Sequence, residues 1–218
     1  FMFGLRQVNL FLGSNNFWKL LRGRFYTPRE EERIFMFLDL QSSTKHAENL
    51  GDIEYSKMIQ DCFNDLGIAI ENEAEIYQYV GDEAILTWKL KDGLNHQNCL
   101  HAYFNFKRRI NKRKQYYLKN YNCSPHFKAG MNAGIVTVAE VGKFKKEIAY
   151  HGDTINTAAR IQGKCNELKQ DFLISESLKN KLSTSGFIFD GLGSIELKGR
   201  ERNILLYAVH QTLQSNCS

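Results

Sequence analysis

Two aspartates occupy positions where a carboxylate is unexpected. Asp39 lies inside the apolar run of residues 34–40, and Asp82 lies between Gly81 and Glu83, where two short strand-like runs meet. A buried and unpaired carboxylate costs several kcal/mol, so we expect Asp39 to face a cleft, a metal ion or a base. Each residue also has an ordinary explanation, since Asp39 could cap a helix and Asp82 could form a turn.

The two aspartates predict a metal site if their strands are neighbours in a sheet. Two carboxylates placed side by side without a cation would force one of them to stay protonated. A bound Mg²⁺ removes this conflict, because hard divalent cations prefer carboxylate oxygens together with substrate phosphates. The pair therefore indicates phosphate chemistry assisted by a divalent metal.

A third group of polar residues lies in the segment GDTINTAARI at 152–161. Asn156 and Arg160 are four residues apart and so share one face of a helix. An amide and a guanidinium presented together suit an oxyanion or a pentavalent phosphate. The alternative is an ordinary helix with a surface arginine. A basic turn at 197–200, which contains Lys198, is the fourth candidate.

The elements that must position these residues alternate irregularly between strands and helices. Hydrophobic periodicity and turn residues predict this order, with adjacent hairpins, which favours an α+β fold over a doubly wound α/β fold. Residues 27–33 are expected to form a charged connector. The expected strands are 34–40, 75–80, 84–88, 125–139, 145–150, 171–174, 187–190, 194–197 and 203–209, and the expected helices are 42–50, 52–72, 92–120, 153–166 and 175–184.

Composition limits the classes of protein. The chain has 218 residues, 43% of them hydrophobic, with two prolines, which excludes a disordered chain, and no apolar run is long enough to span a membrane. The five cysteines have no metal-binding spacing and fit a reducing compartment. Part of the net charge of +5 lies at 107–119, among aromatic residues. This stretch could bind nucleic acid, but helical spacing favours the solvated face of a helix.

Four motifs together resemble the class III nucleotidyl cyclases. FLDLQSST (37–44) and YVGDEAIL (79–86) resemble the two metal-binding segments of that family, GDTINTAARI resembles the segment with its transition-state residues, and ELKGRERNILLYAV (196–209) resembles its closing strands. The resemblance covers residues 33–210. It implies a ferredoxin-like α+β fold with a central, mostly antiparallel sheet flanked by helices, and a head-to-tail homodimer with shared active sites.

The resemblance also implies a role for each matched residue. The reaction would be conversion of a nucleoside triphosphate to the 3′,5′-cyclic monophosphate and pyrophosphate, with two Mg²⁺ or Mn²⁺ ions. Ser42 stands where many members have glycine, which is tolerated if the backbone there has no positive φ. The implied ligands and contacts are Asp39, Asp82 and the Leu40 carbonyl for the metals, Asn156 for the ribose, Arg160 for the α-phosphate, and Ser42, Ser43, Thr44 and Lys198 for the phosphates.

Base recognition is where the chain departs from the family pattern. Gln78 and Ala149 stand at the two positions that usually read the base, and they match neither the adenine pair nor the guanine pair. The amide of Gln78 can donate and accept, so it could read adenine or guanine. Tyr77, Tyr79, Tyr150 and His151 are candidates to fill the space beside Ala149. ATP is favoured because most members use it, and GTP, CTP and UTP stay open.

The remaining expectations concern the ends of the chain and rival functions. The chain begins with Phe, so we expect a fragment in which 1–32 is a helical transducer, 33–210 the catalytic domain and 211–218 a tail. A cytoplasmic enzyme, tethered to the inner face of a membrane or joined to a sensor through a missing upstream region, fits this arrangement. The rivals are a diguanylate cyclase, a ferredoxin-like RNA-binding module and an inactive regulatory cyclase domain.

Overall fold

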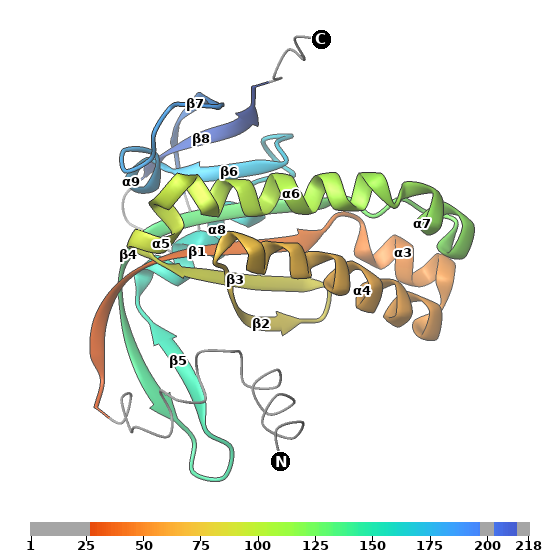
Figure 1. Cartoon of the computed structure of the whole chain (residues 1–218), viewed down its shortest axis with the longest axis horizontal. Helices are drawn as coiled ribbons and strands as arrows, with labels where there is room; N and C mark the ends of the chain where they lie inside the picture. The colour runs from red at the N-terminus through yellow and green to blue at the C-terminus, as the bar shows by residue number, and fades with distance from the viewer. Residues whose placement is uncertain (1–26, 197–202, 213–218) are drawn as a thin grey trace.

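The computed structural model describes residues 27–196 and 203–212, and its core is an eight-stranded sheet (Figure 1). The strand order is β2-β3-β1-β4-β6-β8-β7, with β5 paired to β4. All pairings are antiparallel except β4 with β6. The strands are β1 (Arg29–Leu40), β2 (Glu75–Val80), β3 (Glu83–Lys89), β4 (Phe127–Val141), β5 (Glu147–His151), β6 (Phe172–Ser175), β7 (Phe187–Ile195) and β8 (Ile204–Gln211).

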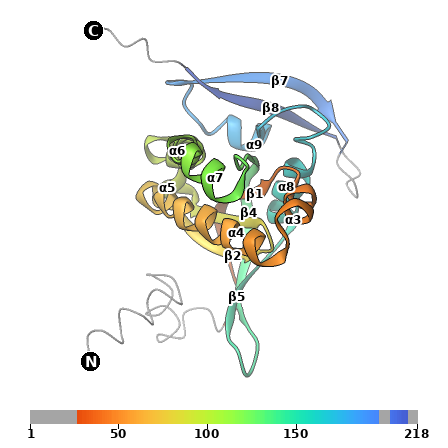
Figure 2. The ribbon, with the colours of Figure 1, turned by 90° about the vertical axis from the view of Figure 1, so that its right-hand side faces the viewer.

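Helices lie on both faces of the sheet (Figures 1 and 2). No helix in the described ranges combines the length and the apolar character that crossing a membrane requires. The helices are α3 (Ser43–Leu50), α4 (Asp52–Leu66), α5 (Leu90–Leu94), α6 (Asn98–Lys112), α7 (Lys114–Tyr121), α8 (Asp153–Gly163) and α9 (Glu176–Lys179), with 3₁₀ turns η1 (Gly67–Asn72) and η2 (Asn95–Gln97).

The apolar run of β1 is buried on both faces, as its sequence predicts. Ile34 and Met36 belong to the core cluster that includes residues of α4 and α6. Phe35 and Phe37 point the other way, into a second core cluster that includes Ala158 of α8. Because side chains alternate along a strand, Asp39 lies on the same face as Phe35 and Phe37, which is the face that α8 covers.

Helix α8 approaches the sheet so closely that only glycine fits beneath it. A Cβ atom added to Gly130 of β4 would lie 2.1 Å from the backbone nitrogen of Gln162 and 2.4 Å from its Cα. The clash would be with backbone atoms, which cannot rotate away as a side chain can. Gly130 therefore allows the last turn of α8 to rest on β4, beside the strand that carries Asp39.

Strand β4 continues beyond the main sheet and forms an arm with β5. Residues 137–141 of β4 pair with 147–151 of β5, and this hairpin projects away from the body of the domain (Figure 2). Phe144 at its tip is fully exposed.

The structure corrects the expectation that residues 27–33 form a connector. Strand β1 already begins at Arg29, and its charged first half alternates between half-buried and exposed residues. The charges are accommodated because Arg29 and Arg33 both form ion pairs with Glu31, and Arg33 also pairs with Glu75. Charged side chains that neutralise one another in this way can form a strand.

Other expected boundaries were wrong where the backbone turns. The single helix expected over 92–120 is divided into α5, α6 and α7, with left-handed backbone at His96 and Gln97 and a break at Arg113. The two strands expected at 187–190 and 194–197 form one strand, β7, with a register shift between Gly191 and Ser194. The helix expected over 175–184 is the single turn α9.

The basic stretch at 107–119 forms the outer side of α6 and α7, as the helical spacing predicts. Leu100 and Tyr117 are fully buried in the core on the inner side. On the outer side, Arg109 and Arg113 both bind Asp65 of α4, at 2.9 and 2.7 Å. The basic residues therefore help to fix α6 and α7 against α4.

We predict that Gly130→Ala lowers the free energy of unfolding by about 2 kcal/mol or more, because the new methyl group would push α8 off β4. The measurement is urea unfolding of both proteins. Gly163→Ala is the matched control, since no atom lies within 4 Å of its added Cβ, and it should stabilise by about 0.5–1 kcal/mol. Equal stability of the two variants would contradict the close packing.

Candidate active site

The antiparallel pairing of β1 with β3 brings three carboxylates together at one end of the sheet. Asp39 lies directly opposite Glu83, and Asp82 is in the turn that precedes β3. Burial and the charge of Asp82 raise the pKa of Asp39. Burial, Asp39 and Asp82 also raise the pKa of Glu83, to about 7. The two predicted metal ligands are therefore neighbours that repel each other when both are ionised.

The residues present fit a hard divalent cation. The Oδ2 atom of Asp82 is buried and has no hydrogen-bond partner, which is costly unless another ligand binds it. The Oδ2 atom of Asp39 accepts a hydrogen bond from Gln162 Nε2 at 3.2 Å. Within 27–196 and 203–212, no cluster of three or more His, Cys, Asp or Glu side chains is arranged to hold a metal ion by itself. Two carboxylates would thus need further ligands, such as the Leu40 carbonyl or phosphate oxygens.

Two residues beside Asp39 were missed by the sequence analysis. Gln162, in the last turn of α8, donates to Asp39. Lys128 faces Asp39 across the β1–β4 pair, is only 8% exposed, and its Nζ donates to Asn166 Oδ1 at 3.0 Å. A buried cation on this face is a candidate phosphate ligand. The place of Lys128 beside Asp39 depends on the register of β4 against β1, so Lys128 could have been found only from that register.

The turn between β1 and α3 ends beside the acidic pair. The backbone of Ser42 has φ +59°, which is the left-handed conformation that favours glycine. Serine was expected to be tolerated at this position only if φ were not positive, and the structure does not meet that condition. The Ser42 side chain makes no capping hydrogen bond. The first N–H groups of α3, at Ser43 and Thr44, therefore lack a side-chain cap and suit an anion.

Tyr55 of α4 is a further neighbour of the acidic pair. Burial, Asp82 and Asp39 all raise the pKa of its hydroxyl, which also interacts with the Ser43 hydroxyl. Tyr55 thus links α4 to the first turn of α3, beside the acidic pair. The sequence contained no signal for this residue, because its contact depends on how α4 packs.

Asn156 and Arg160 lie on α8, as predicted, with Asn156 exposed and Arg160 partly exposed. Arg160 forms an ion pair with Asp153 at the start of the same helix, at 3.6 Å. The contact between α8 and the acidic pair within one chain is made by Gln162, not by these two residues. Their side chains are therefore available on the outer surface of the helix.

A bulge in β2 decides which face Gln78 occupies. The pairing with β3 shifts between Ile76 and Gln78, so that Gln78 lies opposite Ile85, on the face of Asp39 and Glu83. Tyr79 consequently points to the other face, where its ring stacks on Phe63 of α4 at 4.4 Å. Without the bulge, regular alternation would have placed Gln78 on the α4 face.

The second expected base position, Ala149, faces away from its neighbour Tyr150. Ala149 lies on β5 opposite Ala139, and alternation turns it away from the side occupied by Tyr150. Tyr150 is 9% exposed, and its ring meets that of Tyr77, edge to face, at 5.0 Å. Of the aromatic candidates, Tyr77 and Tyr150 therefore lie together next to Gln78, and Tyr79 does not.

Two further observations concern the position of the predicted site residues. Lys198 lies outside the described residues. A cavity of about 380 Å³ lies near the N-terminal end of α6 and is lined by His96, Gln97, His101, Ser185, Gly186, Gln211 and Thr212. None of the predicted site residues lines this cavity, so the acidic pair and α8 occupy a different part of the molecule.

The family of the chain follows from comparison with known proteins. The profile described as "Adenylate and Guanylate cyclase catalytic domain" matches residues 25–211. The chain therefore belongs to the adenylate and guanylate cyclase catalytic domain family, which confirms the resemblance drawn from the four motifs. "Adenylate cyclase 2" of Rhizobium meliloti (strain 1021) is 33% identical over 205 residues, which are 93% of this chain and 56% of that protein. The chain thus spans little more than half of this relative.

Solved structures show the same fold. The adenylyl cyclase CyaB from P. aeruginosa has a TM-score of 0.76 at 18% identity, over 86% of this chain and 98% of that chain. The guanylate cyclase domain of RhGC from Catenaria anguillulae, solved in complex with GTP, has a TM-score of 0.71 at 18% identity, over 84% of this chain and 98% of that chain. These matches confirm the predicted α+β cyclase fold.

We predict that Asp82→Asn raises the melting temperature of the protein in chelator, because it removes a charge that repels Asp39 and Glu83. Mn²⁺ should stabilise the wild type by about 2.7 kcal/mol at a hundred times its Kd, and should stabilise the variant much less. The measurement is thermal unfolding with and without Mn²⁺.

The control for this prediction is Asp190→Asn, since Asp190 pairs with His210 at 3.3 Å on the exposed β7–β8 hairpin. Its response to Mn²⁺ should equal that of the wild type. An equal response to Mn²⁺ in Asp82→Asn would mean that the ion binds elsewhere.

Proposed function

We propose that this chain is a nucleotidyl cyclase that converts ATP to 3′,5′-cyclic AMP and pyrophosphate. The observation that carries the proposal is the pair Asp39 and Asp82, brought together by β1 and β3 with a buried oxygen lacking a partner, in a chain of the cyclase family. Its relative at 33% identity is named an adenylate cyclase, which favours ATP.

Two Mg²⁺ or Mn²⁺ ions, when bound, would activate the ribose 3′-hydroxyl and neutralise the triphosphate. Asp39 and Asp82 would hold them, with the Leu40 carbonyl as a further ligand. Gln162 would keep Asp39 oriented through its hydrogen bond. Lys128, Lys198 and the N–H groups at Ser42, Ser43 and Thr44 would bind the phosphates, because fixed donors are worth most where negative charge accumulates.

Asn156 and Arg160 would act on a nucleotide held by the acidic pair of a second copy of the chain. Asn156 would orient the ribose, and Arg160 would contact the α-phosphate as it becomes pentavalent. The exposed position of Asn156 and the partly exposed position of Arg160 on α8 support this head-to-tail homodimer. Each dimer would then contain two shared sites, and a monomer would be nearly inactive.

We choose adenine as the base because the relative is named an adenylate cyclase and most members of the family use ATP. Gln78 and Ala149 do not themselves select the base. The amide of Gln78 is compatible with either purine. GTP, CTP and UTP are therefore the alternative substrates. An inactive regulatory domain is the second alternative, and the presence of both aspartates, Asn156 and Arg160 argues against it.

The division of the chain belongs to the same proposal. Because β1 begins at Arg29 and β8 ends at Gln211, the catalytic domain would extend slightly beyond the expected 33–210, with a helical transducer before it and a tail after it. A sensor or membrane region upstream of the transducer would place the domain in the cytoplasm, at the inner face of a membrane.

The test is incubation of the protein with ATP, GTP, CTP and UTP separately, in Mg²⁺ and in Mn²⁺, with products identified by mass spectrometry. We expect cyclic AMP and pyrophosphate from ATP. A different cyclic nucleotide as main product would correct the base, and no cyclic nucleotide from any of the four would overturn the proposed activity.

We further predict that Asp39→Ala and Arg160→Ala are each inactive, and that a mixture of the two recovers activity. Random mixing makes half of the dimers heterodimers with one of two sites intact, so the recovery should reach about one quarter of the wild-type rate. The measurement is cyclic AMP formation after mixing, with dimerisation checked by ultracentrifugation. A mixture that dimerises and stays inactive would contradict the shared site.

A further inference from the structure

The two strands that carry the base positions are not hydrogen-bonded to each other. Between β2 and β5 lie β3, β1 and β4, so four strand spacings separate them, which would be about 19 Å in a flat sheet. The rings of Tyr77 on β2 and Tyr150 on β5 nevertheless have centroids only 5.0 Å apart. The sheet must therefore curl so that β5 turns over the face that carries Gln78.

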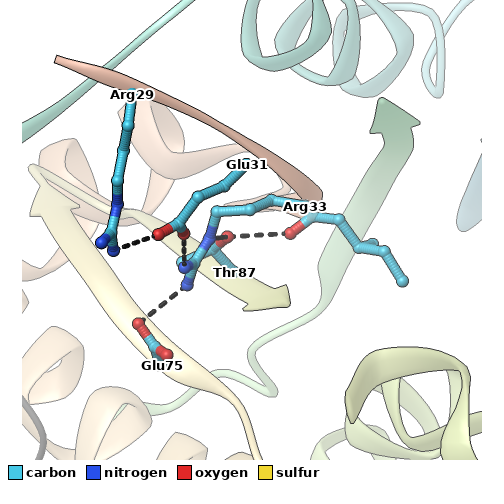
Figure 3. Close-up of polar contacts among 6 residues, drawn as sticks. Arg29, Glu31, Arg33, Glu75 and Thr87 are labelled. Atoms are coloured by element: carbon cyan, nitrogen blue, oxygen red, sulfur yellow. Dashed lines mark hydrogen bonds and ion pairs between the residues drawn. The ribbon is translucent and has the colours of Figure 1, made fainter. Parts of the chain in front are cut away.

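Arg33 of β1 lies inside this curl, opposite Gly134 of β4, and its side chain contacts the other strands around it. Its guanidinium donates to Thr87 Oγ1 of β3 at 3.1 Å, to Glu75 Oε2 of β2 at 2.8 Å, and to Glu31 Oε2 at 3.0 Å (Figure 3). Its Cζ also lies 4.8 Å from the ring centroid of Tyr150 on β5. Three strands and the arm are thus joined by one side chain.

The charge of Arg33 is retained although its side chain is only 2% exposed. Burial alone would lower the pKa of Arg33, but Tyr150, Glu75 and Glu31 outweigh it and the net shift is upward. Thr87 in turn donates to the backbone carbonyl of Ile34 at 2.9 Å, which fixes the acceptor that Arg33 uses. The guanidinium is therefore held in one position by a preorganised set of partners.

We propose that Arg33 is a positioning residue for base recognition. It acts through Tyr150, whose ring it supports together with Phe35, which meets Tyr150 edge to face at 5.3 Å. Tyr150 packs on Tyr77, the bulge residue that immediately precedes Gln78. The inference rests on the proposed cyclase function and adds to it the group that sets the distance between β2 and β5.

The chemistry of this chain explains why such a support is needed. Gln78 carries a neutral amide and Ala149 a methyl group, so no charged pair between β2 and β5 fixes the separation of the two strands. Discrimination between nucleotides without charged contacts would depend on shape, and one methylene more or less in an apolar site changes it by about 10- to 200-fold. Arg33 would preserve that shape by holding Tyr150 in place.

The experiment is steady-state kinetics with ATP, GTP, CTP and UTP for the wild type, Arg33→Met and Tyr150→Leu. Tyr150→Leu leaves the ion pairs of Arg33 intact, so it reports on the ring even if Arg33→Met folds poorly. We expect the KM of the preferred nucleotide to rise about tenfold and the ratio of kcat/KM between the best and second nucleotides to fall about tenfold, with kcat changed by less than about threefold.

The matched control is Arg113→Met. Arg113 also binds a carboxylate, the buried Asp65 at 2.7 Å, and also lies over a tyrosine, Tyr116 at 4.1 Å, but it lies between α6 and α7. A loss of stability lowers the amount of folded protein and leaves the ratio between nucleotides unchanged. The control should therefore keep the wild-type ratio, and Arg33→Lys should recover part of it because the charge between Glu31 and Glu75 is restored.

The outcomes separate this inference from the proposed function. A wild type that forms no cyclic product from any nucleotide overturns the cyclase proposal and this inference with it. A wild type that is active, with an unchanged nucleotide ratio in both Arg33→Met and Tyr150→Leu, overturns only the role of Arg33. An equal change of the ratio in Arg113→Met also overturns it, since the effect would then be general.

Discussion

The structure is organised around the repulsion between carboxylates at the end of β1 and β3. Burial and the charge of Asp82 raise the pKa of Asp39, and an oxygen of Asp82 is buried without a partner. This arrangement does not stabilise the fold, because separating or neutralising the two carboxylates would be favourable. The surrounding elements instead hold the pair together, as expected where a cation and phosphates complete the site.

Those elements act through close packing. Gly130 admits the end of α8 to the surface of the sheet, and Gln162 from that turn donates to Asp39. Directly opposite Asp39, β4 supplies Lys128. A neutral donor and a cation thus lie beside Asp39, and the position of the donor depends on the fit of one helix against one strand.

The same face of the sheet continues from the carboxylates to the base positions. Phe35 and Phe37 separate Asp39 from Arg33 along β1, and these alternate residues share the face that α8 covers. One strand therefore connects the catalytic end to the cluster that joins β2, β3 and β5. Curling of the sheet, rather than any direct strand pairing, brings Tyr150 of β5 onto Tyr77 of β2, beside Gln78.

The sequence by itself determined the family, the α+β class, and the placement of Asp39, Asp82, Asn156 and Arg160 on their elements, because motif order and local periodicity carry that information. Only the tertiary structure decided that a bulge turns Gln78 to the face of the sheet that carries Asp39, and that Lys128 and Arg33 lie on that same face. These facts depend on strand register and sheet curvature, which arise from contacts between distant residues. A shift of the strand register by one residue would move these side chains to the opposite face of the sheet without changing the sequence pattern of the strand.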